Sequence, residues 1–329
     1  MDTVEGAQAR VFVGIGEVLS DVFEDGTEAL GGAPLNVAVH AHQLAEALGI
    51  GQGAVVSCVG RDARGARLVS DLHSRGMTTK YIGSDPVHPT GHVSVLMHNG
   101  EPGYQIATGV AWDFIPSTVD LDELAATCEA VCFGSLAQRS PVSRATILRF
   151  LGNAGHALRL FDINLRRNTL SGEEFYDAGI IESSCRLATM IKANASELIL
   201  VCRLLGIDSS LNEDEAGLRR GAEMLLSRFP AEAVVVTQGA LGAAWYGRKG
   251  EARAAVIPVA ANQLHPVGAG DASSAAILVG CSLGWEPPAI LELANRMGAW
   301  VASQIPATPP LGPGVLAFAR DMRRAYTHT

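Results

Sequence analysis

The chain has 329 residues, of which 48% are hydrophobic and 18% are charged. This composition supplies enough apolar material for a folded core and is unlike that of a disordered chain. The 34 acidic residues outnumber the 25 basic ones, and the net charge of −9 argues against nucleic acid as a partner. Glycine is enriched, with 36 residues, and glycine is favoured where the backbone approaches a ligand closely or adopts unusual dihedral angles.

No targeting or membrane segment is evident in the sequence. The first ten residues lack the basic and apolar regions of a secretory leader, and every apolar run is interrupted well before the roughly 18 residues of a membrane span. The six cysteines form no CxxC pair and none stands at zinc-ligand spacing from a histidine. We therefore expect buried thiols in a cytoplasmic protein without a membrane partner.

Short apolar strands alternate with helical segments along the chain. Such alternation predicts an α/β fold in which helices cover both faces of a mainly parallel sheet. In chain order, strands are expected at residues 11–16, 54–59, 131–134, 158–163, 188–192 and 233–237, and helices at 34–48, 63–75, 141–151, 173–183, 196–205, 216–227, 271–283 and 288–304.

Two segments interrupt this alternation, residues 17–30 and 91–110. Both are strand-like, and they contain the dipeptides Asp25-Gly26 and Asn99-Gly100, which are typical of hairpin turns. We predict that they form a small separate β-sheet that projects as a lid from a single domain spanning residues 1–329.

Several common motifs are absent. Gly14-Ile15-Gly16 is followed by Leu19 where a dinucleotide-binding fingerprint needs a third glycine, which disfavours a nicotinamide oxidoreductase. No Walker-type phosphate loop occurs. His40 and His42 lie two residues apart on a predicted helix and do not share a face, so we interpret them as structural.

The segment Gly268-Ala269-Gly270-Asp271 directly precedes an apolar helix. Glycines let backbone N–H groups converge on one point, and a helix N-terminus adds free donors and a positive dipole end. This pattern predicts an anion hole suited to a phosphoryl group. Asp271 is then either a helix cap or a general base beside that hole, and its position in the sequence does not decide between them.

Other polar and glycine residues follow predicted strands, where open α/β sheets bind ligands. A glycine pair and Asn36 open the first helix, and Thr237 to Gly242 form a further glycine turn. Asp162, Asn164 and Arg166 alternate after a strand, which predicts that they share one face of an extended segment. Asn194 and Glu197 lie one helical turn apart and are plausible outer ligands of a hydrated Mg²⁺.

Six motifs in this order resemble the PfkB/ribokinase family of carbohydrate kinases, and within it the fructokinase-like sugar kinases. The resemblance covers about residues 11–310, and the GAGD and GGAPxN motifs are its most specific part. The motifs are GExLxD (Gly16 to Asp21), GGAPxN (Gly31 to Asn36), D-x-N-x-R (Asp162 to Arg166), N-x-x-E (Asn194 to Glu197), T-x-G-x-x-G (Thr237 to Gly242) and GAGD (Gly268 to Asp271).

The resemblance implies a ribokinase-like three-layer α/β/α sandwich with a β-sheet lid that often forms a homodimer interface, and it implies ATP and Mg²⁺ as cofactors. It also implies a role for individual residues. Asp271 would be the catalytic base and Gly268, Ala269 and Gly270 the anion hole; Asp21, Gly32, Asn36 and Arg166 would bind the sugar; Asn194, Thr237, Gly239, Gly242 and Asn295 would bind the nucleotide; Asn194 and Glu197 would hold Mg²⁺ through water.

Two positions depart from the family pattern. His265 stands where the family usually has an Asp three residues before GAGD, in a loop often linked to monovalent cations, which puts K⁺ dependence in doubt. Ser273 replaces the family's Phe two residues after the predicted base, which we interpret as a packing change.

The expected reaction is transfer of the γ-phosphate of ATP to a primary hydroxyl of a monosaccharide, with fructose as the first candidate. Alternatives within the family are a 2-keto-3-deoxy sugar acid, whose carboxylate an Arg such as Arg166 could bind, and a nucleoside. A nucleoside would require stacking aromatics, and Tyr104 and Trp112 are the only ones in or near the second lid segment. A non-catalytic sugar-binding relative is the remaining alternative, and the intact GAGD motif argues against it.

Overall fold

The computed structural model describes residues 9–98, 101–169, 171–255, 257–259 and 265–327. Its main sheet has nine strands in the order β13-β12-β11-β10-β9-β8-β1-β4-β5, parallel from β5 to β11 and antiparallel at β12 and β13. The strands are β1 (Arg10–Ile15), β4 (Gly51–Gly60), β5 (Ile82–Asp85), β8 (Ala130–Phe133), β9 (Leu158–Asp162), β10 (Met190–Asn194), β11 (Ala233–Thr237), β12 (Ala243–Gly247) and β13 (Gly250–Ala254).

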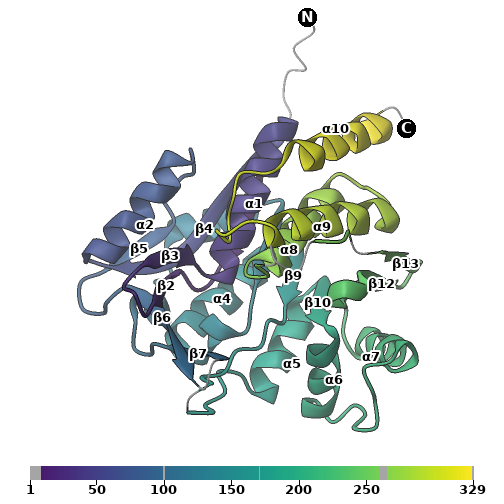
Figure 1. The fold of residues 1–329 in the computed structure, drawn as a ribbon, viewed down its shortest axis with the longest axis horizontal. Helices are drawn as coiled ribbons and strands as arrows, with labels where there is room; N and C mark the ends of the chain where they lie inside the picture. The colour runs from purple at the N-terminus through teal and green to yellow at the C-terminus, as the bar shows by residue number, and fades with distance from the viewer. Residues whose placement is uncertain (1–8, 99–100, 170, 256, 260–264, 328–329) are drawn as a thin grey trace, which may run out of the picture.

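Helices cover both faces of this sheet, because parallel strands are apolar on both sides and each face needs a cover. One buried cluster joins the sheet to α1, α8, α9 and α10, and a second joins it to α3 through α7. Figure 1 labels these helices except α3. The helices are α1 (Ala33–Leu48), α2 (Ala63–Ser74), α3 (Val119–Thr127), α4 (Pro141–Asn153), α5 (Ala178–Leu187), α6 (Ala195–Leu204), α7 (Glu215–Arg228), α8 (Ala269–Ser282), α9 (Pro287–Ala302) and α10 (Pro313–Thr327).

The predicted lid is present as a separate four-stranded sheet in the order β3-β2-β6-β7. It is built from β2 (Leu19–Phe23), β3 (Glu28–Gly31), β6 (Gly91–His98) and β7 (Glu101–Ile106). Strands β2 and β6, from the two segments that interrupt the α/β alternation, pair in parallel. Gly26 has the positive φ of 81° expected of the first turn, whereas Asn99-Gly100 lies outside the described residues.

The helix expected at 173–183 begins later and extends further, so this prediction is wrong at its start. Asp177 accepts a hydrogen bond from the backbone N–H of Ile180 and thereby caps α5, which starts at Ala178. Residues 173–177 are instead drawn into a loop, because the carbonyl of Glu173 accepts from Asn168 and Phe175 donates to the carbonyl of Arg166. The sequence also did not predict α3, α10, β5, β12 and β13.

The structural interpretations of cysteine and histidine are confirmed. Among the six cysteines only Cys281 is partly exposed, and all are free thiols. His40 and His42 are buried against backbone carbonyls, and burial lowers the pKa of His40 to about 4. In the part of the chain that the structure describes, no helix has the length and hydropathy needed to cross a bilayer.

Strand β1 and helix α1 approach so closely that a side chain would not fit between them. A Cβ atom at Gly14 would lie 1.9 Å from the carbonyl oxygen of Pro34, in the first turn of α1. This contact sets the depth at which the N-terminus of α1 lies over the sheet, and therefore the position of Asn36 in the same first turn.

We expect Gly14→Ala to destabilise the fold by about 3 kcal/mol or more, because the clash is with backbone that cannot move aside. The matched control is Gly152→Ala in α4, where an added Cβ meets nothing within 4 Å and where alanine should add up to about 1 kcal/mol. Urea unfolding of both variants measures the difference, and equal stabilities would contradict this account of β1 and α1.

Candidate functional site

Of the two GAGD glycines at the start of α8, only the first occupies a position that requires glycine. Gly268 has a φ of 83°, and a Cβ there would lie 2.5 Å from the carbonyl oxygen of Ala307. Gly270 has no such conflict, since its nearest neighbour would be the Lys192 Nζ at 3.7 Å. The first glycine therefore forms the turn, and the second leaves open space next to a buried ammonium group.

Asp271 does not cap the helix. The N-cap is Gly268, which makes no side-chain capping bond, and the Asp271 Oδ2 instead accepts a hydrogen bond of 2.8 Å from the Asn36 Nδ2 in the first turn of α1. Burial raises the pKa of Asp271 to about 6; the negative charge of Asp162 adds to this, while the Asn36 hydrogen bond and two cations, Lys192 and Arg166, oppose it. The Asp271 carboxylate is thus held beside the glycine turn at the start of α8.

The amides beside this carboxylate are available to a ligand. Ala269 donates to the carbonyl of Pro266 over 3.2 Å and Ala272 donates to that of Gly268 over 2.9 Å. The intervening N–H groups of Gly270 and Asp271 have no acceptor among the described residues. Free amides at the positive end of a helix form an anion-binding site.

A buried ion pair that the sequence analysis did not single out lies under this turn. Lys192 on β10 donates to the Asp162 Oδ2 over 2.8 Å, and both side chains are almost fully buried. Ser274 on α8 donates to the same oxygen over 2.7 Å and lies 3.2 Å from the carbonyl oxygen of Gly270. Burial alone would lower the pKa of Lys192, but the Asp162 charge and hydrogen bond raise it above its ordinary value. The sequence does carry a signal of this ion pair, because Lys192 is a charged residue within an otherwise apolar strand.

The polar residues of the D-x-N-x-R motif do not share one face, contrary to the expectation from their alternation. Strand β9 ends at Asp162, and Asn164 has a φ of 40°, so the chain turns and no longer runs extended. Asp162 consequently points into the core while Arg166 is exposed. The motif supplies one buried anion and one accessible cation.

Asn194 and Glu197 form a capping box at the start of α6. The Asn194 Oδ1 accepts from the N–H of Glu197 over 2.8 Å, and the Glu197 Oε2 accepts from the N–H of Asn194 over 2.9 Å. The other Glu197 oxygen accepts from Leu165 over 3.0 Å. Each carboxylate oxygen keeps acceptor capacity for a water molecule, so the pair fits a hydrated Mg²⁺ bound through water. No group of three or more His, Cys, Asp or Glu side chains able to hold a metal directly occurs within the described ranges.

The residues expected at the sugar site gather around the lid and the start of α1. Gly32 has a φ of 113°, and a Cβ there would lie 2.5 Å from the Glu17 carbonyl oxygen. Burial raises the pKa of Asp21 on β2 to about 6, against the opposing charge of Arg166. Burial also raises the pKa of Glu17 to about 7, and its Oε2 has no hydrogen-bond partner within the described residues. Glu17, which had no predicted role, thus shares this electrostatic environment with Arg166 and Asp271.

The residues expected at the nucleotide site lie on two parts of the fold. Gly239 and Gly242 have positive φ angles of 55° and 89° and bracket the short turn between β11 and β12, next to Thr237. Asn295 on α9 uses its amide group to donate to the carbonyls of Ala254 and Ala255 over 3.0 and 2.8 Å. The two N–H groups of the Asn295 amide therefore join α9 to the last residue of β13 and to the residue after it.

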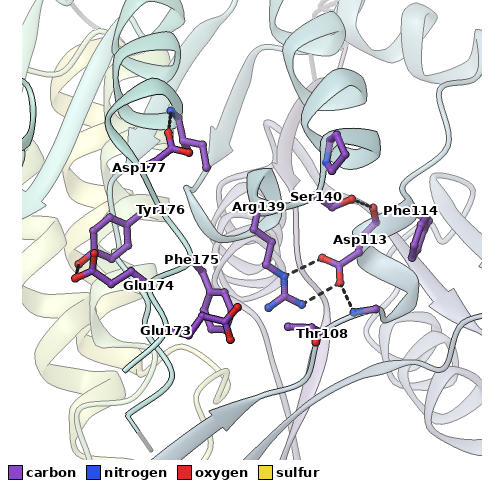
Figure 2. A pocket seen from close by; sticks show the side chains of 13 residues that line it. Thr108, Asp113, Phe114, Arg139, Ser140, Glu173, Glu174, Phe175, Tyr176 and Asp177 are labelled. Carbon is purple, nitrogen blue, oxygen red and sulfur yellow. Dashed lines mark hydrogen bonds and ion pairs between the residues drawn. The ribbon is translucent and has the colours of Figure 1, made fainter. Parts of the chain in front are cut away.

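A cavity of about 430 Å³ opens away from these groups, and none of the predicted site residues lines it. It lies between the chain that leaves the lid and the loop before α5, and the side chains of Arg139 and Asp113 meet beside it (Figure 2).

The buried Glu17 should make stability depend on pH. Below its ordinary pKa of 4.5 the Glu17 carboxyl group is protonated in both the folded and the unfolded chain. Between pH 4.5 and the folded pKa of about 7 only the folded chain keeps this proton, so the free energy of unfolding falls as pH rises through this range. Above pH 7 the ionised, buried Glu17 lowers the free energy of unfolding by about 3 kcal/mol. Glu17→Gln should therefore be more stable, relative to the unchanged protein, at pH 8 than at pH 5. Urea unfolding at both pH values measures this, with the exposed Glu213→Gln as control; equal differences would refute it.

The comparisons with known proteins identify the family and the fold. Residues 12–311 match the family model of the pfkB family carbohydrate kinases. The sugar kinase PH1459 of Pyrococcus horikoshii is 29% identical over 252 residues, which are 76% of this chain and 72% of that protein. Its crystal structure has a TM-score of 0.75 to this chain, covering 95% of this chain and 99% of that chain.

Two other solved structures show the same fold at lower identity. Fructokinase of Xylella fastidiosa with bound ATP has a TM-score of 0.78 and 20% identity, with 94% and 98% of the two chains covered. Aminoimidazole riboside kinase of Salmonella enterica has a TM-score of 0.72 and 22% identity, with 94% and 99% covered. The predicted architecture is confirmed, and since the family model spans nearly the whole chain, the protein belongs to the pfkB family of carbohydrate kinases, phosphotransferases that act on sugars.

Proposed function

We propose that this sugar kinase transfers the γ-phosphate of ATP to a primary hydroxyl of a neutral monosaccharide, with fructose as the first candidate. The observation that carries the proposal is the Asp271 carboxylate, held by Asn36 at 2.8 Å, beside free amides at the N-terminus of α8. This arrangement places a proton acceptor next to an anion site, which is what phosphoryl transfer to an alcohol needs.

Asp271 acts as the general base in this proposal. With a pKa near 6 it is mostly ionised at neutral pH yet basic enough to take the hydroxyl proton as the new bond forms. We assign the anion hole to Gly268, Ala269 and Gly270. The Ala269 N–H is already bonded to Pro266, so the free N–H groups of Gly270 and Asp271, together with the helix dipole, would stabilise the charge that develops on the transferred group.

The chemistry of the lid side favours a polyol. We assign sugar binding to Asp21, Gly32, Asn36 and Arg166. The carboxyl groups of Asp21 and Glu17 and the Asn36 Oδ1, which has no partner within the described residues, are hydrogen-bond acceptors. Acceptors in this number suit a ligand that brings hydroxyl donors. Burial already penalises the ionised forms of Glu17, Asp21 and Asp271, and hydroxyl donors would satisfy these carboxyl groups without adding charge.

The nucleotide is assigned to the opposite end of the site. Asn194 and Glu197 would hold Mg²⁺ through water, and the bound ion would neutralise phosphate charge as the γ-phosphate leaves. Gly239 and Gly242 carry no side chain at the two ends of the turn after β11, where a nucleotide would approach, with Thr237 beside it. Asn295, whose amide donors are bound to backbone, would line the site by shaping the chain beyond β13.

A 2-keto-3-deoxy sugar acid is the second candidate. The Arg166 side chain forms no ion pair or hydrogen bond with the described residues and is exposed, so its guanidinium is free to bind a carboxylate. A nucleoside is less well supported. Trp112 is 1% exposed and packs against Gly91, so of these two aromatics only Tyr104 is exposed. A non-catalytic relative would not need the geometry of Asp271 described above.

The experiment that tests the substrate is a coupled ADP-release assay with ATP and Mg²⁺ across ketoses, pentoses, nucleosides and sugar acids. The highest kcat/KM with fructose or another neutral hexose supports the proposal, and preference for a sugar acid replaces it with the second candidate. The same panel is run with and without K⁺. We expect no K⁺ requirement, because an imidazole at His265 replaces the carboxylate that would attract a cation.

We expect Asp271→Asn to lower kcat by about 10²–10⁴, since the amide cannot accept the proton. The unchanged protein should show kcat/KM rising with pH through an apparent pKa near 6, the value expected for Asp271, because only the ionised carboxylate is a base. ATP binding by calorimetry is the control and should persist in the variant. Near-normal turnover of a folded Asp271→Asn protein would remove the base assignment.

We also expect a cytoplasmic homodimer formed through the lid sheet. Its outer strand β3 offers an edge for pairing, whereas the edge of the other outer strand, β7, is already bonded at Tyr104 by Thr169. Sedimentation equilibrium should give a mass of two chains. A single-chain mass at every concentration up to about 100 μM, well above a typical dimer Kd of about 1 μM, would contradict this expectation.

A further inference from the structure

We propose that Arg139 is a positioning residue that ties the loop carrying Arg166 to the chain leaving the lid, so that sugar binding depends on it while ATP binding does not. The inference rests on the proposed sugar kinase activity and adds a residue that no motif indicates. Arg139 ends a short 3-10 helix, Leu136–Arg139, which follows β8.

The first link joins Arg139 to Asp113, in the segment that runs from the lid back into the core. Its Nε and Nη2 donate to the two carboxylate oxygens of Asp113 over 2.9 and 3.0 Å, a forked ion pair in which both side chains are more than nine-tenths buried. The same Asp113 accepts from the backbone N–H groups of Gly109 and Val110 over 2.9 and 3.2 Å. Figure 2 shows the guanidinium directed at this carboxylate.

The second link reaches the lid itself. The Nη2 of Arg139 also donates to the carbonyl oxygen of Ala107 over 2.6 Å, and Ala107 directly follows the last residue of β7. The chain is therefore held by one buried guanidinium group at the point where it leaves the lid sheet and again where it enters the core. Forked ion pairs of this kind fix orientation as well as distance.

The third link runs to the sugar-binding loop. The guanidinium of Arg139 lies between two rings, 4.0 Å from the centroid of Trp112 and 4.8 Å from that of Phe175. Phe175 closes the base of the loop that begins at Arg166, because its N–H donates to the Arg166 carbonyl over 3.1 Å. Arg139 thus contacts the loop through the ring of Phe175 without touching Arg166 itself.

The tip of the same loop already touches the lid. Thr169 donates its N–H to the carbonyl of Tyr104 on β7 over 3.1 Å, and its hydroxyl accepts from the N–H of Tyr104 over 2.6 Å. The loop is therefore anchored at its tip to a lid strand and at its base to Arg139. These two anchors place Arg166 relative to Asp21 on the lid, whereas no contact of Arg139 leads to α8 or to the turn after β11.

Phe175→Leu is the sharpest test, because it removes the ring that joins Arg139 to the loop and leaves the buried ion pair with Asp113 intact. Phe229→Leu is the matched control, since the ring of Phe229 is equally buried and lies beneath the guanidinium of Arg228 at 5.4 Å, on another part of the molecule. Arg139→Lys, which keeps the charge but loses the fork, is the second variant.

We expect Phe175→Leu and Arg139→Lys each to raise KM for the sugar about tenfold, the size of one lost buried cation–π contact, with KM for ATP within twofold of the unchanged protein. The double variant should be little worse than the poorer single one, because both changes break the same link. Phe229→Leu should change neither constant. Unchanged KM for the sugar in folded Phe175→Leu, or equal rises for sugar and ATP, would overturn the proposal.

A second measurement separates this inference from the proposed activity. Hydrogen exchange of the amides of Thr169 and Phe175 should accelerate at least tenfold in Phe175→Leu and stay unchanged in Phe229→Leu, whatever the substrate is. If the exchange is unchanged, the link does not exist and the inference fails. If the exchange accelerates in a protein that phosphorylates no sugar on the panel, the proposed function fails while the link stands.

Discussion

The hydrogen bond between Asn36 and Asp271 is the interaction on which the site depends. It joins the first turns of α1 and α8, two helices that pack side by side on the same face of the sheet although their residues are 235 positions apart. Both helices start at a glycine with positive φ, Gly32 and Gly268, in contact with backbone that would exclude a side chain. The two turns can therefore approach closely enough for a short amide and a short carboxylate to meet.

Charge around this bond is arranged so that a strongly acidic protein can hold an anion. The buried carboxyl groups of Glu17, Asp21 and Asp271 all have raised pKa values because burial penalises their ionised form. The positive field comes from the N-terminus of α8 and from Lys192, whose ammonium lies under Gly270. A net charge of −9 argues against an extended polyanion as a partner, but it does not prevent local binding of a nucleotide to amides and a helix dipole.

The lid is joined to the core by apolar packing of Leu19, Val93 and Ile106 and by polar side chains, of which Arg139 makes the most varied contacts. Arg139 contacts the chain that leaves β7, the carboxylate of Asp113 and the ring of Phe175, and the loop between Arg166 and Phe175 contacts β7 at its tip. The loop is therefore attached to the lid at its tip and, through Phe175 and Arg139, to the core at its base.

The sequence by itself determined the alternation of strands and helices, the two lid segments and the glycine turn before an apolar helix, because periodicity, turn dipeptides and helix-start signals are local. Tertiary structure alone decided the rest. That Asp271 bonds to Asn36 and does not cap its helix, that Asp162 is buried against Lys192 while Arg166 is exposed, and that α5 starts only at Ala178 all depend on contacts between distant segments. A pattern along the chain records which residues are polar, but burial, partners and pKa values arise only when strands that lie far apart in sequence meet at one edge of the sheet.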